Sequence, residues 1–510
     1  MATHSKSDEL EPLLSPTSPT SPTSPTPQTL RKKETQKVWY KTASAYWLLP
    51  SFMLIAIING LGITVKIQFY LRAVCYDYYS NKSQFISTSF LLNPINDYPD
   101  EWCNNADVQA MTSRFLLILD LCSAVPAIFV LAPLGLLSDI KGRKICLLIA
   151  VAGSILTTLN ILLVGNYIDT FGIYFLLVGA LFDGITGGLL SLISASYAYA
   201  TDCTSPTQRS VIFGWMQGAF FAGFIGPTIG GWIIELTDNL LSVFYVMIAV
   251  YIMTFFYFLF ILPESLTKEK LSENLKRQQE SNSTFDRNQL FKSWIIYTSV
   301  NTLLTTAIMG IQAIFLLYVT LVFKWSLVDQ GYYFIILGVS RIIVLFILFP
   351  LLISNIKKNI FLNNIKNNVQ INIDNNNDDE PIPIEDNEDN EEKHLRKYEV
   401  WILRFALFID VLAYAGYGLA TSSSMFVVAS VIASLGSVSS SVIKSLQTNL
   451  VAPSQIGQLL GALCVLDSIG RIISPVVFNA LYSILVVTSP HLIWYGVTFL
   501  IAAAFYYLSV

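Results

Sequence analysis

Long apolar segments recur along the chain from Trp47 to the end, separated by short polar connections. A bilayer core of about 30 Å requires about 20 helical residues to cross it. The segments that meet this requirement predict an all-α integral membrane protein with twelve transmembrane helices. They lie near residues 47–71, 113–137, 145–165, 171–199, 210–235, 241–262, 294–322, 331–354, 400–421, 424–447, 457–483 and 490–509.

Polar segments divide these spans into two sets of six. The charged stretch 263–293 predicts a cytoplasmic linker between two pseudo-symmetric six-helix bundles, at 46–262 and 294–510. Residues 355–397 are rich in Asn, Asp and Glu and have too few large apolar residues to offset the entropy of ordering. We therefore expect a disordered insertion there.

The first 45 residues predict a disordered cytoplasmic tail without a cleavable signal peptide. Ser15 to Thr26 consists of four Ser-Pro-Thr triplets, which is typical of an extended tether. Before it, Glu9, Leu13 and Leu14 fit the acidic dileucine pattern that binds clathrin adaptors, although such hexapeptides also occur by chance. The pattern favours an endosomal or lysosomal membrane, with the plasma membrane as the alternative.

Lys and Arg residues predict the orientation of the spans. They gather before the first span and after the second, sixth and eighth, so both termini are expected in the cytoplasm. Asn81 then begins a glycosylation sequon in the long first luminal loop. Cys75 and Cys103 bracket the same loop, where a disulfide or two free thiols are both open, because sequence does not give their distance.

Composition agrees with a membrane protein and excludes several partners. Of 510 residues, 53% are hydrophobic and 13% charged, whereas soluble domains are about 25% charged. The net charge of -4 arises because acidic residues concentrate in one loop while other cytoplasmic segments are basic, so nucleic acid is not expected as a partner. The six cysteines lack metal-ligand spacing and a C-x-x-C pair, and we expect no metal or cofactor. Membrane lipid surrounds a chain that we expect to be a monomer.

The two halves contain an internal repeat. Thr201–Gln208 matches Thr448–Gln455 at an offset of 247 positions (448 minus 201), and Gly214 and Gly461 continue the match. The segments connect the fourth span to the fifth and the tenth to the eleventh. These are equivalent places in a duplicated six-helix unit, as pseudo-symmetric bundles require.

Ionisable groups inside the spans are the candidate solute and proton pathway, because each is costly in hydrocarbon unless it lines water or finds a partner. Asp183, Arg341, Asp410 and Asp467 fall near mid-membrane. Arg471 lies one turn beyond Asp467, and a structural ion pair is the alternative reading of these two. The remaining candidates are Lys66, Asp120 and the uncharged Gln217 and Gln312.

A charged, glycine-punctuated turn links the second and third spans. Gly135 allows two helix backbones to approach, and Gly142 permits a positive φ. Asp139 can cap a helix N-terminus or pair with an arginine, while Arg143 and Lys144 hold the turn in the cytoplasm. In the fifth span Gly226, Pro227, Gly230 and Gly231 predict a kink, with either a packing role or a role in transport.

The turn at 135–144, Asp183 to Gly188, Asp202 to Arg209 and Leu262 to Ser265 resemble the major facilitator superfamily. Within it, they are similar to the branch of the proton-coupled folate transporter and thymic stromal cotransporter and to tetracycline-exporter-like members. The resemblance implies that Asp139 and Arg143 control an inward-facing gate and that Asp183 supports helix packing and transport. Gln217 replaces the acid tied to proton coupling in the folate transporter, and that branch's functional histidines are absent from the spans.

These observations predict a secondary active transporter that moves a small organic solute by alternating access. Arg341, Lys66 and Arg471 favour an anionic or zwitterionic solute, and a membrane carboxylate such as Asp183, Asp120 or Asp467 would couple its movement to protons. An enzyme is not expected, because no histidine lies deep in a span to support a metal or nucleophile. A receptor or scaffold that does not transport is the alternative.

Overall fold

The computed structural model describes residues 43–81, 103, 106–266, 287–325, 327–374 and 384–488, and all regular structure among them is helical. Ten helices in these ranges are long and apolar enough to cross a membrane. The predicted span 294–322 lies in a further long helix, α13 (Arg287–Phe323). The predicted span 490–509 lies outside the described residues.

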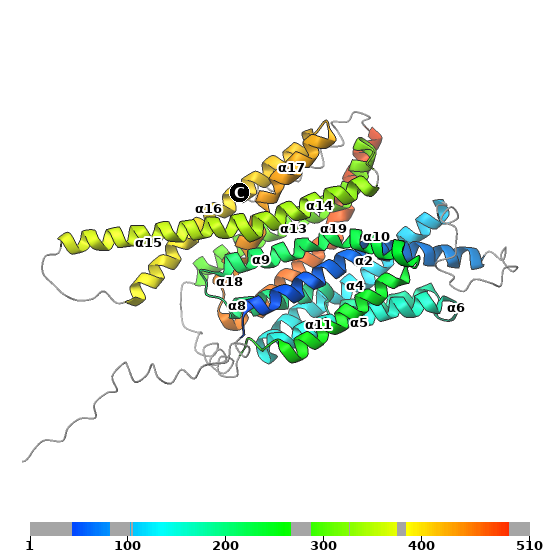
Figure 1. The fold of residues 1–510 in the computed structure, drawn as a ribbon, viewed down its shortest axis with the longest axis horizontal. Helices are drawn as coiled ribbons and strands as arrows, with labels where there is room; N and C mark the ends of the chain where they lie inside the picture. The colour runs from blue at the N-terminus through cyan, green and yellow to red at the C-terminus, as the bar shows by residue number, and fades with distance from the viewer. Residues whose placement is uncertain are drawn as a thin grey trace, which may run out of the picture. The chain divides into compact units, whose positions relative to one another are not determined.

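We call the helices up to η5 the N-terminal half and those from α13 onward the C-terminal half. The N-terminal half contains α2 (Ala45–Asn81), α4 (Ala106–Lys141), α5 (Arg143–Asn166), α6 (Ile168–Phe171), η3 (Ile173–Phe175), α7 (Leu176–Ile185), α8 (Gly188–Asp202), α9 (Arg209–Phe221), η4 (Ala222–Ile225), α10 (Gly226–Thr237), α11 (Leu241–Phe256) and η5 (Tyr257–Ile261). The C-terminal half contains α13, α14 (Leu327–Ile343), η6 (Val344–Leu348), α15 (Phe349–Asp374), α16 (Ile384–Leu419), α17 (Ser423–Gly436), α18 (Val438–Asn449), η7 (Pro453–Gln455) and α19 (Ile456–Thr488). Figure 1 shows these helices by label.

Two spans of the N-terminal half are interrupted at glycine. Gly187 takes φ 72° between α7 and α8, a conformation that residues with a Cβ rarely adopt. In the fifth span, the 3-10 turn η4 separates α9 from α10, and Pro227 occupies the first turn of α10, where its missing N–H costs no hydrogen bond.

The glycines of the fifth span bring it against α2. A Cβ on Gly223 would lie 2.6 Å from the carbonyl oxygen of Ala56, and one on Gly226 would collide with the backbone at Leu61. Gly230 has slightly more room, at 3.2 Å from the Leu61 oxygen, while nothing lies within 4 Å of the Cβ position of Gly231. The kink therefore has a packing function along most of its length.

The structure corrects the expected disordered insertion at 355–397. Helix α15 continues to Asp374 and α16 begins at Ile384, so only 375–383 lies outside the described residues between them. A helix that is already nucleated in a span extends at low cost, one hydrogen bond for each residue added. Ile353 and Ile360 are buried at helical spacing. Composition alone did not reveal this continuation. Figure 1 shows α15 in yellow-green and the start of α16 in yellow.

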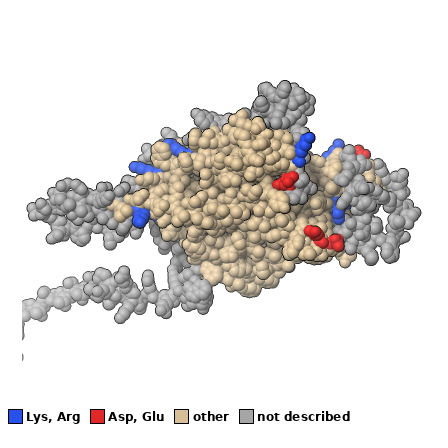
Figure 2. Space-filling model, turned by 45° about the horizontal axis from the view of Figure 1, so that its top comes forward, with Lys and Arg blue, Asp and Glu red and all other residues tan. Residues whose placement is uncertain are grey.

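Each half has its own apolar core, and residues of the other half join it. Leu459 and Leu463 of α19 belong to the core of the N-terminal half, and Phe221 of α9 belongs to that of the C-terminal half. The halves meet where α19 packs on α4 and α8, α18 on α9, and α14 on η4. Figure 2 shows a broad band without charged side chains across the middle of the displayed face, as lipid contact requires.

Several predicted features lie at the edges of the described chain. Glu9, Leu13 and Leu14 are outside it, and Asn81 is the last residue of α2, with the rest of its sequon outside. Cys75 and Cys103 are joined by a disulfide, with their Cα atoms 5.4 Å apart.

Candidate functional site

A buried arginine organises the end of the bundle where α4 is followed by α5. Arg143 is 0% exposed and donates from Nη1 to Asp139 Oδ1 at 2.5 Å and from Nε to Asp202 Oδ2 at 2.9 Å. It also donates to Ser138 Oγ at 3.1 Å. Two carboxylates thus compensate a guanidinium that would otherwise be very costly to bury.

The turn that places Arg143 depends on Gly142 and Glu264. Gly142 takes φ 107°, and a Cβ there would lie 2.6 Å from Glu264 Oε2. The Glu264 carboxylate, just after η5, accepts hydrogen bonds from the backbone N–H of Arg143 at 2.9 Å and of Lys144 at 3.2 Å. A carboxylate at the N-terminus of α5 is favourable because the first N–H groups of a helix lack partners.

Residues that follow the sixth span are tied to the same arginine. Glu264 Oε1 also accepts from the backbone N–H of Ser265 at 3.0 Å, and Ser265 Oγ donates to Asp202 Oδ2 at 3.0 Å. Lys144 instead turns outward and donates from Nζ to the Leu259 carbonyl at 2.8 Å. The start of the central linker is therefore fixed on the arginine network.

Asp139 connects the two halves. Its carboxylate accepts hydrogen bonds from the backbone N–H groups of Gly457 at 2.9 Å and Gln458 at 2.8 Å, in the first turn of α19. Asp139 is thus both the ion-pair partner of Arg143 and the cap of a helix in the other half. We call Asp139, Arg143, Asp202, Glu264 and the first turn of α19 the charge cluster.

Glycines let the backbones of α4 and α19 meet at the charge cluster. A Cβ on Gly457 would lie 2.5 Å from both Arg143 Nη1 and the Gly135 oxygen, and one on Gly461 would lie 2.8 Å from the Leu131 oxygen. Gly135 faces the same contact from α4. The two halves are therefore closed on each other at this end.

A second contact between the halves lies where the two copies of the internal repeat meet, at the start of α9 and the end of α18. Arg209, at the start of α9, donates from Nη1 to Asn449 Oδ1 at 2.6 Å and to the Thr448 carbonyl at 3.4 Å, at the end of α18. Gly214, the repeat counterpart of Gly461, packs on Phe349, at 2.9 Å from its Cβ position. Closure at the second contact thus uses an aromatic ring together with the hydrogen bonds of Arg209 to the end of α18.

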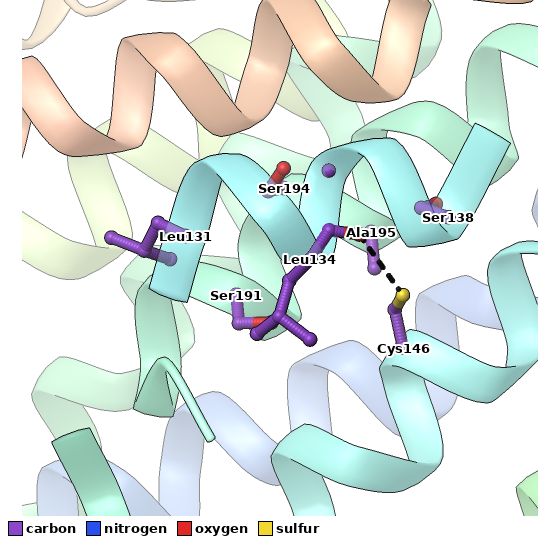
Figure 3. Close-up of a pocket in the computed structure, with 8 residues that line it drawn as sticks. Leu131, Leu134, Ser138, Cys146, Ser191, Ser194 and Ala195 are labelled. Atoms are coloured by element: carbon purple, nitrogen blue, oxygen red, sulfur yellow. Dashed lines mark hydrogen bonds between the residues drawn. The ribbon is translucent and has the colours of Figure 1, made fainter. Parts of the chain in front are cut away.

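A small hollow lies beside the charge cluster, between α4, α5 and α8 (Figure 3). Its lining is mostly apolar, with Ser138, Ser191 and Ser194 as polar members and Cys146 at the edge. The Cys146 thiol donates to the Leu134 carbonyl at 3.3 Å, drawn as the dashed line in Figure 3. None of the predicted mid-membrane charges lines the hollow, and we do not assign the solute to it.

Asp183 lies inside the N-terminal half. Its Oδ2 accepts from Ser123 Oγ of α4 at 2.8 Å, and it interacts electrostatically with Lys66 of α2. Tyr70 and Tyr251 also lie within its electrostatic range. The Asp183 carboxylate lies close to the helix break at Gly187 and Gly188. A Cβ on Gly188 would lie 2.8 Å from Asp183 Oδ1, so only glycine leaves room for the carboxylate there. Asp183 is thus half-buried with polar partners on two helices.

Arg341 lies between the halves. Its guanidinium carbon is 4.5 Å from the ring centroid of Phe221, across the contact of α14 with the fifth span. Its buried Nε has no hydrogen-bond partner among the described residues. Asp410 interacts with it electrostatically but is itself buried, facing Ser439 Oγ at 3.5 Å and leaving no room for a Cβ on Gly436.

Lys444 is a second cation between the halves that sequence reasoning did not select. Its Nζ lies 4.5 Å from the ring centroid of Tyr197 on α8. The Tyr197 hydroxyl donates to Gln217 Oε1 on α9 at 3.2 Å. Asp467 interacts with Lys444 at longer range, and its buried Oδ1 has no hydrogen-bond partner among the described residues. A lysine near the end of a predicted span can snorkel to the membrane surface, but the Lys444 side chain turns inward to Tyr197.

The remaining candidates are more peripheral. Arg471 is exposed and does not form the i,i+4 ion pair with Asp467, although the two interact at longer range. It also interacts electrostatically with Asp120 on α4, across the halves. Gln312 on α13 is exposed. The structure thus groups Asp467 with Lys444 and Asp120 with Arg471, pairings that linear spacing does not predict.

Comparisons with known proteins agree with this architecture. The family model described as Major Facilitator Superfamily matches residues 45–363. "MFS-type transporter avaJ" of Aspergillus versicolor is 26% identical over 473 residues, covering 89% of this chain and 85% of the relative. The class B tetracycline resistance protein of Escherichia coli is 31% identical over 178 residues, covering 34% of this chain and 41% of its own. The bovine proton-coupled folate transporter is 27% identical over 131 residues, or 25% of this chain and 28% of that one.

Solved structures share the fold. The human organic anion transporter MFSD10 superposes with a TM-score of 0.61 at 15% identity, covering 91% of this chain and 98% of its own. FucP in its outward conformation superposes with a TM-score of 0.57 at 13% identity, covering 91% and 97%. Together with a helical bundle closed at one end by Asp139 and Arg143, the family match shows that this chain belongs to the Major Facilitator Superfamily of membrane transporters.

Proposed function

We propose that the chain is a secondary active transporter of a small organic anion and that it works by alternating access, driven by protons. The observation that supports the anionic solute best is Arg341. This guanidinium lies between the halves against Phe221, with a buried Nε that lacks a hydrogen-bond partner among the described residues. A cation at this depth is costly unless it serves a ligand or a partner.

The charge cluster would hold the conformation that is open on the opposite side. Asp139 caps α19 across the halves, and Arg143 fixes Asp139. Opening the closed end requires these hydrogen bonds to break, so the cluster acts as a latch whose release accompanies movement of one half against the other.

Asp183 is the proposed proton carrier. It lies between Ser123 on α4 and Lys66 on α2, with Tyr70 and Tyr251 within electrostatic range. Loss or gain of a proton on Asp183 would change its interaction with Lys66, and that change offers a route from proton binding to helix movement in the N-terminal half.

Uptake by purified protein in liposomes tests the proposal. A pool of radiolabelled organic anions should enter under an imposed pH gradient, and Arg341→Gln should abolish this uptake. Asp183→Asn should remove the response to the pH gradient but retain exchange of solute down its own gradient. Glu235→Gln, at an exposed position, is the control. Binding without uptake would instead support a receptor of the same fold.

We also propose an endosomal or lysosomal location, with Glu9, Leu13 and Leu14 as the adaptor signal and a glycan on Asn81. Replacing Leu13 and Leu14 by alanine should move the protein to the cell surface, and Asn81→Gln should remove a glycosidase-sensitive mobility shift. An unchanged location in the dileucine variant would exclude this signal.

A further inference from the structure

Two cations of the C-terminal half share an unusual arrangement. Arg341 of α14 lies over Phe221 and Lys444 of α18 lies over Tyr197, each at 4.5 Å from the ring centroid. Both rings belong to the N-terminal half. Neither cation lies within ion-pair distance of a carboxylate in the part of the chain that the structure describes. Each of these two cations therefore contacts the N-terminal half through a cation–π contact.

The rings that contact the two cations are connected through the fifth span. Phe221 follows Gln217 by four residues on α9, which places them one turn, or about 6 Å, apart along the helix axis. Gln217 accepts the hydroxyl of Tyr197, the ring that lies beneath Lys444. The ring beneath Arg341 is thus linked to the ring beneath Lys444 through one turn of α9 and the hydrogen bond between Tyr197 and Gln217.

The available carboxylates do not neutralise this pair. Asp410 and Asp467 act on Arg341 and Lys444 only at longer range, and Asp410 is enclosed by Ser439 and Gly436. The stabilisation from a cation–π contact is smaller than the cost of a buried unpaired charge. Both cations thus retain capacity to bind anionic groups.

We propose that the solute is an organic dianion, with one anionic group bound by Arg341 and the other by Lys444. This proposal rests on the proposed transport of an organic anion. The planar guanidinium would bind a carboxylate through two hydrogen bonds, and the ammonium would act as a point charge. Gln217 and Tyr197 would contact the segment between the anionic groups. Because the ligand would replace ring contacts from the other half, its binding would also loosen the interface between the halves.

Isothermal titration of the purified full chain with α,ω-dicarboxylates, from succinate to sebacate, tests this proposal. Each acid is compared with its monomethyl ester, which keeps the chain but removes one charge. We expect one chain length to bind best and its monoester to bind at least about tenfold more weakly, as loss of a charge pair predicts. Lys444→Gln should bind the diacid and the monoester equally.

The variants separate a binding role from a folding role. Lys444→Arg should retain the preference for the diacid, and Lys358→Gln, at an exposed position of α15, should leave it unchanged. Arg341→Gln should reduce binding of both the diacid and the ester. Three outcomes would overturn the proposal of a dianionic solute. They are equal binding of the diacid and the ester by the native chain, a preference for the diacid that survives in Lys444→Gln, and no binding of any diacid at millimolar concentration. If the diacid preference were intact but no anion were taken up, the transport function would be refuted and the binding of a dianion would stand.

Discussion

Arg209 donates a hydrogen bond of 2.6 Å to Asn449, the residue that occupies the position of Asp202 in the internal repeat. Asp202 holds Arg143 within the N-terminal half, whereas Asn449 binds an arginine from the other half. The duplicated connections have thus diverged into an internal tie and a tie between the halves. The second tie predicts an energetic coupling that can be measured.

Arg209→Ala and Asn449→Ala should each increase the population open at this end, and the double variant should add little. Residues in direct contact show coupling energies of about 0.5–3 kcal/mol in double-mutant cycles. The open fraction can be measured from the distance between spin labels at Lys141 and Ala452, which are exposed in α4 and before η7. Fully additive effects would show that the two residues act independently.

Asp139→Asn should favour the same open population through α19. The neutral amide accepts the N–H groups of Gly457 and Gln458 less well, and it leaves Arg143 with one carboxylate. A lost cap of about 1–2 kcal/mol changes the population ratio about 5- to 30-fold. The same label pair reports the change. Asp238→Asn, at an exposed residue with φ 49°, is the control, since asparagine also accepts this conformation.

Gly457→Ala should open the same end without any change of charge. The added Cβ would lie 2.5 Å from Arg143 Nη1 and from the Gly135 oxygen, so α4 and α19 would have to separate. Such overpacking costs about 1–3 kcal/mol. Gly231→Ala has no atom within 4 Å of the new Cβ and should leave the label distance unchanged. A native distance in Gly457→Ala would contradict the close contact.

Glu264→Gln should weaken the charge cluster although Glu264 does not touch the Arg143 guanidinium. Its carboxylate accepts the backbone N–H groups of Arg143, Lys144 and Ser265, and an amide can present only one oxygen to them. An unsatisfied buried group costs about 1–3 kcal/mol. We expect a lower Tm in detergent and a larger open fraction, with Glu264→Asp recovering part of both. Unchanged values in Glu264→Ala would contradict this role.

Removal of the disulfide should lower the stability of the protein without opening the charge cluster. Cys75 and Cys103 are 28 positions apart, and closing a loop of this size contributes about 3–4 kcal/mol in the chain-entropy model. Cys75→Ser, Cys103→Ser and the double variant should have equally reduced Tm values. Cys122→Ser, which removes a free thiol, should match the native protein. A single variant that is less stable than the double would indicate a harmful free thiol.

Sequence patterns identified the class of protein and many local features. Apolar runs of about 20 residues predict spans because a helix satisfies its own backbone hydrogen bonds within the bilayer, and ten helices of the described chain are long and apolar enough to cross a membrane. The motif permits a positive φ at Gly142 and a pairing of Asp139 with an arginine, and the structure has both, with Arg143 four residues after Asp139. These features depend on residues within one turn or one short motif, so local chemistry is sufficient to predict them.

Tertiary structure decided which distant residues meet. Three pairings join positions more than 100 residues apart. They are Asp139 with the first turn of α19, Lys444 with Tyr197, and Glu264 with the start of α5. Spacing along the chain suggests an ion pair of Asp467 with Arg471, which the fold does not form. Asp467 also interacts with Lys444 of α18, and the exposed Arg471 also interacts with Asp120 of α4. The sequence by itself determined the helices and the charges that must be buried, and helix packing determined their partners.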